Sequence, residues 1–255
     1  MESGIHIALK AETITTVFGV PITNTMLMSW VVVATLIVLA YYIRKDLRKI
    51  PGKVQTFAET ICSFMLDYIE EVLESRPLAL RFFPFIATMF FFILCGNWFG
   101  LLPGIGSLTV VPSAGVHETG KGVAEAVDLL HPTSVDLNVT LALAIISFVV
   151  VEALGISFVG TRKYLGKFFT LKSPIAFLVG IIELISEFAR LVSFSFRLFG
   201  NMFAGKTLIL VAMFFVPYVL PVPLMLYEVF VGFIQAAIFA LLTLFFIKLA
   251  VSEAH

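Results

Sequence analysis

Apolar runs long enough to cross a lipid bilayer recur along the whole of this 255-residue chain. A helix of about 20 apolar residues spans the hydrocarbon core. We predict such helices over residues 26–43, 82–102, 139–160, 175–216 and 222–250. Hydrophobic residues make up 60% of the chain and charged residues only 13%, whereas an average soluble domain is roughly a quarter charged. The sequence therefore predicts an all-α, polytopic membrane protein with about five membrane helices in a single domain over residues 1–255.

Charge and cysteine content exclude several classes of function. Lys and Arg together number 17, and so do Asp and Glu, so the chain has no net charge and no broad basic surface for nucleic acid. The two cysteines and four histidines are too scattered for a disulfide framework or a metal site. We expect neither a cofactor nor a metal.

The loops between the predicted spans differ in charge. The basic residues follow the first and third spans: Arg44, Lys45, Arg48, Lys49 and Lys53, then Arg162, Lys163, Lys167 and Lys172. The loop 103–137 has a single lysine, Lys121, against Glu118, Glu125, Asp128 and Asp136. Basic loops remain in the cytoplasm. We therefore expect residues 1–25 to form an external N-terminal segment and the C-terminus to be cytoplasmic.

Residues 51–75 are too polar to span and show the apolar spacing of an amphipathic helix. We expect this helix on the cytoplasmic face of the membrane. Its polar face is acidic, which fits either a protein partner or simple exposure to water.

The predicted helix over 175–216 would be roughly 60 Å long if continuous. It must lie nearly along the membrane plane or break, with Gly200 and Gly205 as candidate break points. An unusual polar stripe runs along one side of it: Glu183, Glu187, Arg190, Arg197 and Asn201, with Ser186 and Ser193 between them. Ionisable residues at membrane depth pair with one another or line ion paths.

For the first half of this stripe two interpretations remain open. Its residues line an ion path, or Glu183 or Glu187 forms an ion pair with Arg190. Arg197 differs, since no acid follows it within a turn and its neighbours four residues away are Ser193 and Asn201.

Pro217, Pro221 and Pro223 predict an external turn between the last two helices, which then form an antiparallel hairpin over 175–250. In such a hairpin, the residue numbers of any two facing residues add up to nearly the same value, the index sum. Arg197 then lies level with Gln235, and Lys206 with Glu228. We predict a membrane salt bridge between Lys206 and Glu228, whereas Arg197 and Gln235 have no matching anion.

The segment SFSFRLFGNMFAG over residues 193–205 closely resembles the signature of subunit a of the F-type ATP synthase, the stator of its membrane sector. Three further segments resemble that family in order and spacing: NWFGLLP over 97–103, DLNVTL over 136–141 and QAAIF over 235–239. Together they cover about residues 80–250.

The resemblance implies a non-catalytic subunit in a bacterial cell membrane, packed against a rotating ring of c subunits. Further partners would be the peripheral-stalk b subunits, membrane lipid and, indirectly, the catalytic head. Arg197 matches the essential arginine of the family. A guanidinium remains charged when desolvated and holds a passing ring carboxylate ionised. It also blocks proton leakage between two aqueous half-channels.

The expected orientation divides the remaining polar residues between these half-channels. Glu183, Ser186, Glu187, Arg190 and Ser193 fall on the cytoplasmic side of Arg197. Asn201, Lys206 and Glu228 fall on the outer side, joined by Asn97, Asp136 and Asn138 at the external access. Gln235 matches the glutamine of the family that faces the arginine. For Asp136 and Asn138, capping of the following helix is an equal alternative.

Lys206 and Glu228 depart from the family, which commonly has an acid and a histidine at these positions. Glu228 can still relay a proton, whereas the role of Lys206 is open. Glu152, inside the third span, faces another subunit or pairs with a polar group.

Two other functional classes fit the sequence less well. A self-contained secondary transporter is the alternative, although no internal repeat of the Arg197 segment is present. An intramembrane enzyme would need a nucleophile or metal motif, and neither H-E-x-x-H nor G-x-S-x-G occurs.

Overall fold

The computed structural model describes residues 11–45, 47, 51–102, 104–105, 108–110, 127–168 and 173–252. The helices are α1 (Asn24–Lys45), α2 (Lys53–Leu73), α3 (Arg76–Phe99), α4 (Leu137–Val159), α5 (Thr161–Phe168), α6 (Pro174–Phe215) and α7 (Pro221–Ser252). The short strands β1 (Thr13–Val17) and β2 (Val20–Thr23) form one antiparallel hairpin, and β3 (Thr109–Val110) pairs with β4 (Val127–Asp128). A 3-10 turn, η2 (Thr133–Val135), precedes α4.

The predicted all-α membrane architecture is confirmed, with small additions. Helices α1, α4, α6 and α7 begin and end within two residues of the predicted bounds, and α2 lies inside the predicted amphipathic segment. The prediction for α3 was shifted, because the helix begins at Arg76, where Ser75 and Pro77 form a favourable N-terminus, and ends at Phe99 before Gly100. The two strand pairs, η2 and α5 were not predicted, because each is too short to show a hydrophobic period.

Within the described part of the chain, four helices are long and apolar enough to cross a membrane, namely α1, α3, α4 and α7. Helix α6 is not one of them, and Glu183, Glu187 and Arg190 lie in its first half. It is nevertheless a single unbroken helix of 42 residues. Of the two alternatives for its length, the break at Gly200 or Gly205 is therefore excluded, and a steep tilt remains. At about 1.5 Å per residue, α6 is about twice as long as a bilayer core is thick.

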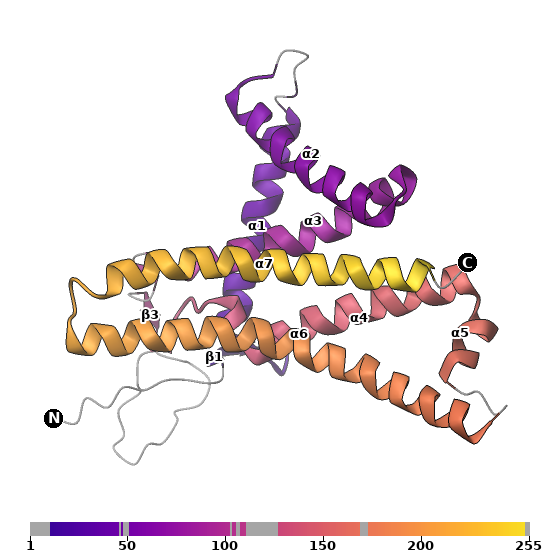
Figure 1. The fold of residues 1–255 in the computed structure, drawn as a ribbon. Helices are drawn as coiled ribbons and strands as arrows, with labels where there is room; N and C mark the ends of the chain where they lie inside the picture. The colour runs from indigo at the N-terminus through magenta and orange to yellow at the C-terminus, as the bar shows by residue number, and fades with distance from the viewer. Residues whose placement is uncertain are drawn as a thin grey trace.

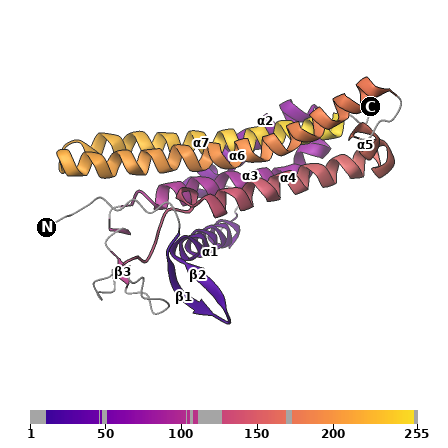
Figure 2. The ribbon, with the colours of Figure 1, turned by 90° about the horizontal axis from the view of Figure 1, so that it is seen from below.

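The long helices lie in two directions (Figure 1). Helices α3, α4, α6 and α7 run along a common direction, whereas α1 crosses them steeply and is seen almost end-on in the view of Figure 2. Helices α6 and α7 form the predicted antiparallel hairpin, joined by a short turn before Pro221. They run side by side near this turn and diverge toward the start of α6. Helices that cross so steeply cannot all follow the membrane normal.

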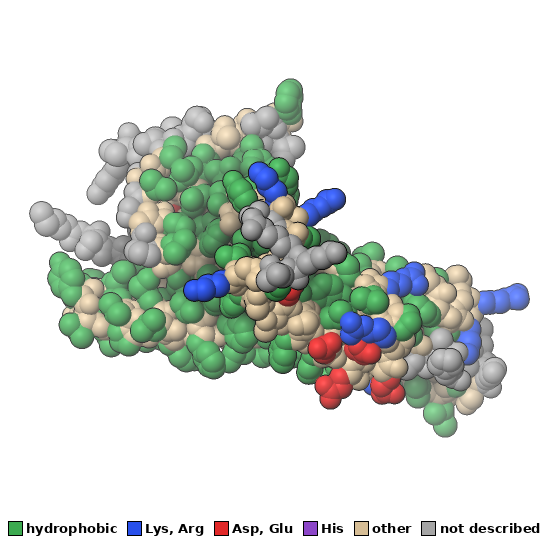
Figure 3. All heavy atoms as spheres, turned by 90° about the horizontal axis from the view of Figure 1, so that it is seen from above, with side chains coloured by type: hydrophobic (Ala, Val, Ile, Leu, Met, Phe, Trp, Pro, Cys, Tyr) green, Lys and Arg blue, Asp and Glu red, His purple; other side chains and the backbone are tan. Residues whose placement is uncertain are grey.

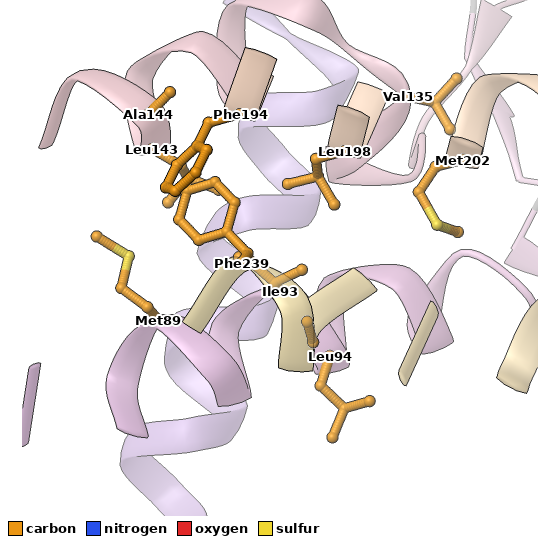
Figure 4. Packing of buried hydrophobic residues seen from close by; sticks show 11 residues of the cluster. Met89, Ile93, Leu94, Val135, Leu143, Ala144, Phe194, Leu198, Met202 and Phe239 are labelled. Atoms are coloured by element: carbon orange, nitrogen blue, oxygen red, sulfur yellow. The ribbon is translucent and has the colours of Figure 1, made fainter. Parts of the chain in front are cut away.

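The core lies between α3, α4, α6 and α7. Phe194 and Leu198 of α6 meet Phe239 of α7 there, with 5.1 Å between the centroids of the two phenylalanine rings (Figure 4). A second cluster joins α2 to α3 and α7 through residues such as Ile69, Ile86 and Leu244. Large apolar side chains also cover much of the outer surface (Figure 3), as expected of a chain whose solvent is lipid.

Several residues of the charge argument lie outside the described residues: Arg48, Lys49, Glu118, Lys121, Glu125 and Lys172, together with residues 1–10 of the N-terminal segment. Of the acids on α2, Asp67 and Glu70 form ion pairs with Arg76 at the start of α3. Part of the acidic face of α2 is therefore satisfied within the chain.

Candidate functional site

Arg197 lies in the middle of α6 and is half-buried as a whole residue. Nη2 donates to Ser193 Oγ, one turn earlier, at 3.3 Å. Among the described residues, no carboxylate forms an ion pair with Arg197. The prediction that this arginine has no acid of its own subunit is therefore met throughout the described part of the chain.

Gln235 of α7 lies level with Arg197, as the index sum predicted. The two residues line the same small cavity, of about 10 Å³, together with Phe194, Leu198 and Phe239. Gln235 is 8% exposed. An amide has both donors and acceptors, so Gln235 places an uncharged polar group beside the guanidinium and leaves its charge uncompensated.

Arg190, two turns before Arg197, is in a different environment. Its Nη1 donates to Glu187 Oε2 at 2.8 Å, and its guanidinium carbon lies 3.9 Å from the centre of the Phe246 ring. Both contacts stabilise a cation. For Glu187 and Arg190, internal pairing is confirmed.

A cleft of about 470 Å³ opens between α4, α5, α6 and α7 where α6 diverges from α7. Glu183, Ser186, Glu187 and Arg190 line its α6 side. Glu152 of α4 also lines this cleft and accepts a hydrogen bond from the Tyr164 hydroxyl of α5 at 2.7 Å. The open choice for Glu152 is thus resolved in favour of a polar partner within the chain.

The predicted salt bridge between Lys206 and Glu228 is wrong. Lys206 Nζ instead lies 3.0 Å from Nδ1 of His131, a residue just before η2. Burial, and secondarily the charge of Lys206, lowers the pKa of His131 to about 4. The imidazole is therefore neutral at physiological pH and can accept a hydrogen bond from the ammonium.

Glu228 nevertheless lies level with this part of α6, as predicted. A Cβ added at Gly205 would overlap its carboxylate, so only a glycine at this position leaves room for it. Glu228 is 3% exposed, and its Oε2 has no hydrogen-bond partner within the described chain.

Asp136 caps α4 and ties it to α1. Its Oδ1 accepts from the backbone N–H of Asn138 at 2.9 Å and from Asn138 Nδ2 at 3.1 Å. Its Oδ2 accepts from Thr25 Oγ1 at 2.8 Å. The capping alternative is thus confirmed for Asp136, and Asn138 is a donor to that cap. The place of both residues at an external access stays a prediction.

The two remaining asparagines are placed differently. Asn97 is 1% exposed and donates to the carbonyl of Gly232 at 3.2 Å, which joins α3 to α7, while its Oδ1 has no partner within the described chain. Asn201 is exposed and donates to the backbone carbonyl of Arg197 at 2.8 Å. Neither amide contacts the Arg197 guanidinium through a hydrogen bond in the described chain.

Sequence reasoning missed two residues of this region, His131 and Tyr164. Both lie outside the long helices, and their partners are 75 and 12 residues away along the chain. Helical spacing carries no information about such contacts.

The chain is similar to known proteins over most of its length. The profile of the family described as "ATP synthase A chain" matches residues 26–248. The chain is 31% identical to "ATP synthase subunit a" of Geotalea daltonii over 229 residues, covering 89% of this chain and 87% of that protein. It is 36% identical to the protein of the same name from Mycobacterium ulcerans, covering 89% and 86%. It is 34% identical to "ATP synthase subunit a, chloroplastic" of Stigeoclonium helveticum, covering 90% and 85%.

Since the family profile covers most of the chain, and these relatives are matched over nearly their whole length, this chain belongs to the ATP synthase A chain family.

Proposed function

We propose that this chain is the ion-conducting stator subunit of a rotary F-type ATP synthase, in which Arg197 separates two aqueous half-channels. As a family member it is a proton-translocating, multi-pass membrane subunit that is not an enzyme by itself. The observation that carries the half-channel proposal is the guanidinium of Arg197, which has no ion-pair partner within the described chain.

The unpaired state of Arg197 supports a partner that arrives from outside the chain. An arginine at membrane depth is costly, and such residues pair or face an ion path. Within the described chain Arg197 has only a hydroxyl and an amide nearby. A ring of c subunits, each with a membrane carboxylate, supplies the missing anion in turn. Each carboxylate releases its proton at the arginine, because a nearby positive charge favours the anion.

The polar side chains on either side of Arg197 support two separate paths. The cleft lined by Glu183 and Ser186 lies toward the start of α6, which the positive-inside rule assigns to the cytoplasm. Glu228, Lys206 and His131 lie toward the α6–α7 turn, which the same rule places outside. Arg197 lies between these groups, so a proton passes from one to the other only on a ring carboxylate.

The steep angle between α1 and the pair α6 and α7 supports the proposed contact of this pair with the c subunits. If α1 follows the membrane normal, then α6 and α7 lie strongly tilted, which also accommodates the length of α6. Tilted helices pass the upright helices of a ring at mid-membrane and keep Arg197 near the ring carboxylates. Exposed apolar side chains such as Phe188, Phe196 and Phe230 supply surface for the ring or for lipid.

The remaining partners follow from the same proposal. Peripheral-stalk b subunits hold the chain against rotation, and the catalytic head is coupled through them. The N-terminus is outside and the C-terminus is in the cytoplasm of a bacterial cell. A self-contained secondary transporter is not supported by the family match.

Replacing Arg197 tests the proposal. We expect Arg197→Ala to abolish ATP-driven proton pumping by membrane vesicles that contain the complete synthase, while the subunit still copurifies with its complex. The matched control is Arg162→Ala, since Arg162 is an exposed arginine of α5. Pumping by Arg197→Ala at the level of this control would refute the proposal.

A further inference from the structure

The cleft and two small cavities follow one another through the interior of the chain, from the start of α6 toward Arg197. The cleft of about 470 Å³ shares Arg190 and Phe246 with a cavity of about 10 Å³, here called the Arg190 cavity, which Ser147 of α4 also lines. The cavity of about 10 Å³ beside Arg197 and Gln235, here called the Arg197 cavity, comes next along α6. Each small cavity has room for about one water molecule.

The side chain of Phe194 stands between the two small cavities. Among the residues that the structure describes, it is the one that lines both of them. It is 6% exposed. The centre of its ring lies 5.1 Å from that of Phe239 and 5.4 Å from that of Phe246, and Figure 4 shows the Phe194 and Phe239 rings against each other. Aromatic neighbours on α7 therefore hold this ring in place.

The polar groups of the interior lie on either side of this ring. Ser147 and Arg190 line the cavity before it, and Arg197 and Gln235 line the cavity after it. A proton moves through a protein along water molecules and polar side chains that hydrogen-bond to one another. A phenyl ring offers no such group, and apolar constrictions exclude water. The Phe194 side chain therefore interrupts the interior route between the cleft and Arg197.

We infer that Phe194 is an apolar barrier that keeps the water of the cleft away from the inner side of Arg197. This inference rests on the proposed function, in which the cleft belongs to the cytoplasmic path. Ser193 and Asn201, one turn on either side of Arg197, are exposed on the outer face of α6. Protons from the cleft then reach the carboxylates of the c subunits only along that outer face.

Hydroxyl-radical labelling of the complete synthase in detergent tests the inference, because radicals formed from water oxidise the side chains that contact water. Leu198 is the reporter, since it lines the Arg197 cavity and is 1% exposed. Its oxidation is quantified by mass spectrometry and is normalised to that of Tyr218, which is 88% exposed in the turn before α7.

Two variants that each lose one phenyl ring are compared. Phe194→Ala joins the two small cavities, and the polar groups on both sides can then hold water. We expect the oxidation of Leu198 to rise about tenfold, which corresponds to hydration favoured by about 1.4 kcal/mol. Phe239→Ala is the matched control, because it removes an equal ring beside the Arg197 cavity and leaves Phe194 in place. We expect Leu198 to be oxidised in this control as in the wild type.

Phe194→Val is a second, milder variant that keeps a branched apolar side chain, and we expect a smaller rise in the same direction. Unchanged oxidation of Leu198 in both Phe194 variants overturns the inference. An equal rise in Phe239→Ala also overturns it, because any enlarged cavity would then admit water.

The labelling result is independent of the test of the proposed function, which is proton pumping by Arg197→Ala. If Arg197→Ala pumps normally while Leu198 labels as expected, the stator proposal is refuted and the barrier remains as a property of the fold. If Arg197→Ala loses pumping while Leu198 stays unlabelled in both Phe194 variants, the barrier alone is refuted.

Discussion

Two half-buried arginines of α6, Arg190 and Arg197, have opposite kinds of partner. Around Arg190, a carboxylate 2.8 Å away and an aromatic ring 3.9 Å away neutralise and cover the guanidinium. Around Arg197, two turns later on the same helix, the contacts are a serine hydroxyl at 3.3 Å and the cavity shared with Gln235. Residue type and helix are the same, so the difference lies in the partners alone.

This difference supports the proposal that Arg197, and not Arg190, meets a partner outside the chain. Breaking a buried ion pair is destabilising, so a paired arginine is explained by its own partner. An unpaired arginine at membrane depth has no such explanation. Lys206 is intermediate, because its partner His131 is polar but uncharged.

Giving Arg197 a partner like that of Arg190 has the largest expected effect. In Ser193→Glu the new carboxylate stands where the guanidinium already contacts Oγ. We expect ATP-driven proton pumping to fall by at least about tenfold, since a competing ion pair of about 1.4 kcal/mol displaces the ring carboxylate to that extent. Quinacrine-type fluorescence quenching on vesicles measures it.

Ser193→Gln is the control for that prediction, because it has nearly the same size and no charge. Equal pumping by the Glu and Gln variants would mean that charge pairing at Arg197 is irrelevant.

Removing the carboxylate that pairs with Arg190 makes the surroundings of Arg190 resemble those of Arg197. In Glu187→Gln the guanidinium keeps only the Phe246 ring and a neutral amide. We expect the purified complex in detergent to lose about 2 kcal/mol of stability, less than for a fully buried pair because Arg190 is partly exposed. Thermal unfolding measures the loss. The double variant Glu187→Gln, Arg190→Met should recover most of it, and a double variant less stable than the single one would contradict the pairing.

Lowering the pH tests whether His131, the partner of Lys206, is uncharged in the fold. The pKa of His131 is about 4 in the fold against 6.5 in an unfolded chain. Between these pH values the unfolded chain binds the proton more tightly, so the free energy of unfolding falls as the pH decreases. At pH 5.5 we expect a loss of about 1.4 kcal/mol relative to pH 7.5. Denaturant unfolding in detergent checks this, and His131→Gln should abolish this part of the pH dependence; an identical loss in that variant would assign it to other groups.

The smallest effect is expected from a change in the cleft that Arg190 also lines. There the Tyr164 hydroxyl donates a hydrogen bond to Glu152. Tyr164→Phe removes one hydrogen bond and should cost about 1 kcal/mol of stability. The ring still packs on Gly155, so proton pumping should stay at the wild-type level. Thermal unfolding and pumping of the same preparation check both parts, and lost pumping would give Tyr164 a direct place in the path.

The regular helices were predictable because apolar residues recur every three or four positions along one face of a helix. The bounds of α1, α4, α6 and α7 followed from this within two residues. So did the level placement of Arg197 with Gln235 and the placement of Glu228 beside the turn of α6 that holds Lys206. The start of α3 was missed because Arg76 and Arg81 hide its periodic apolar pattern.

The partner of Lys206 could not be predicted in the same way. The index sum placed Glu228 beside this turn of α6 correctly, yet the flexible lysine turns to a histidine 75 residues away. The same limit applies to Asp136, where the sequence predicted a cap and the fold added Thr25 of α1, 111 residues away.

The sequence by itself determined that this chain lives in a membrane, where its helices lie along the chain and which of its arginines lacks a nearby acid. These properties depend on composition and on neighbours within two turns of a helix. Only the tertiary structure decided that α6 is unbroken beside α7, that Arg190 is covered by Phe246 and that Lys206 binds His131 rather than Glu228. Such choices depend on how distant segments pack and on where a flexible side chain finds its best acceptor, and neither is encoded in local spacing.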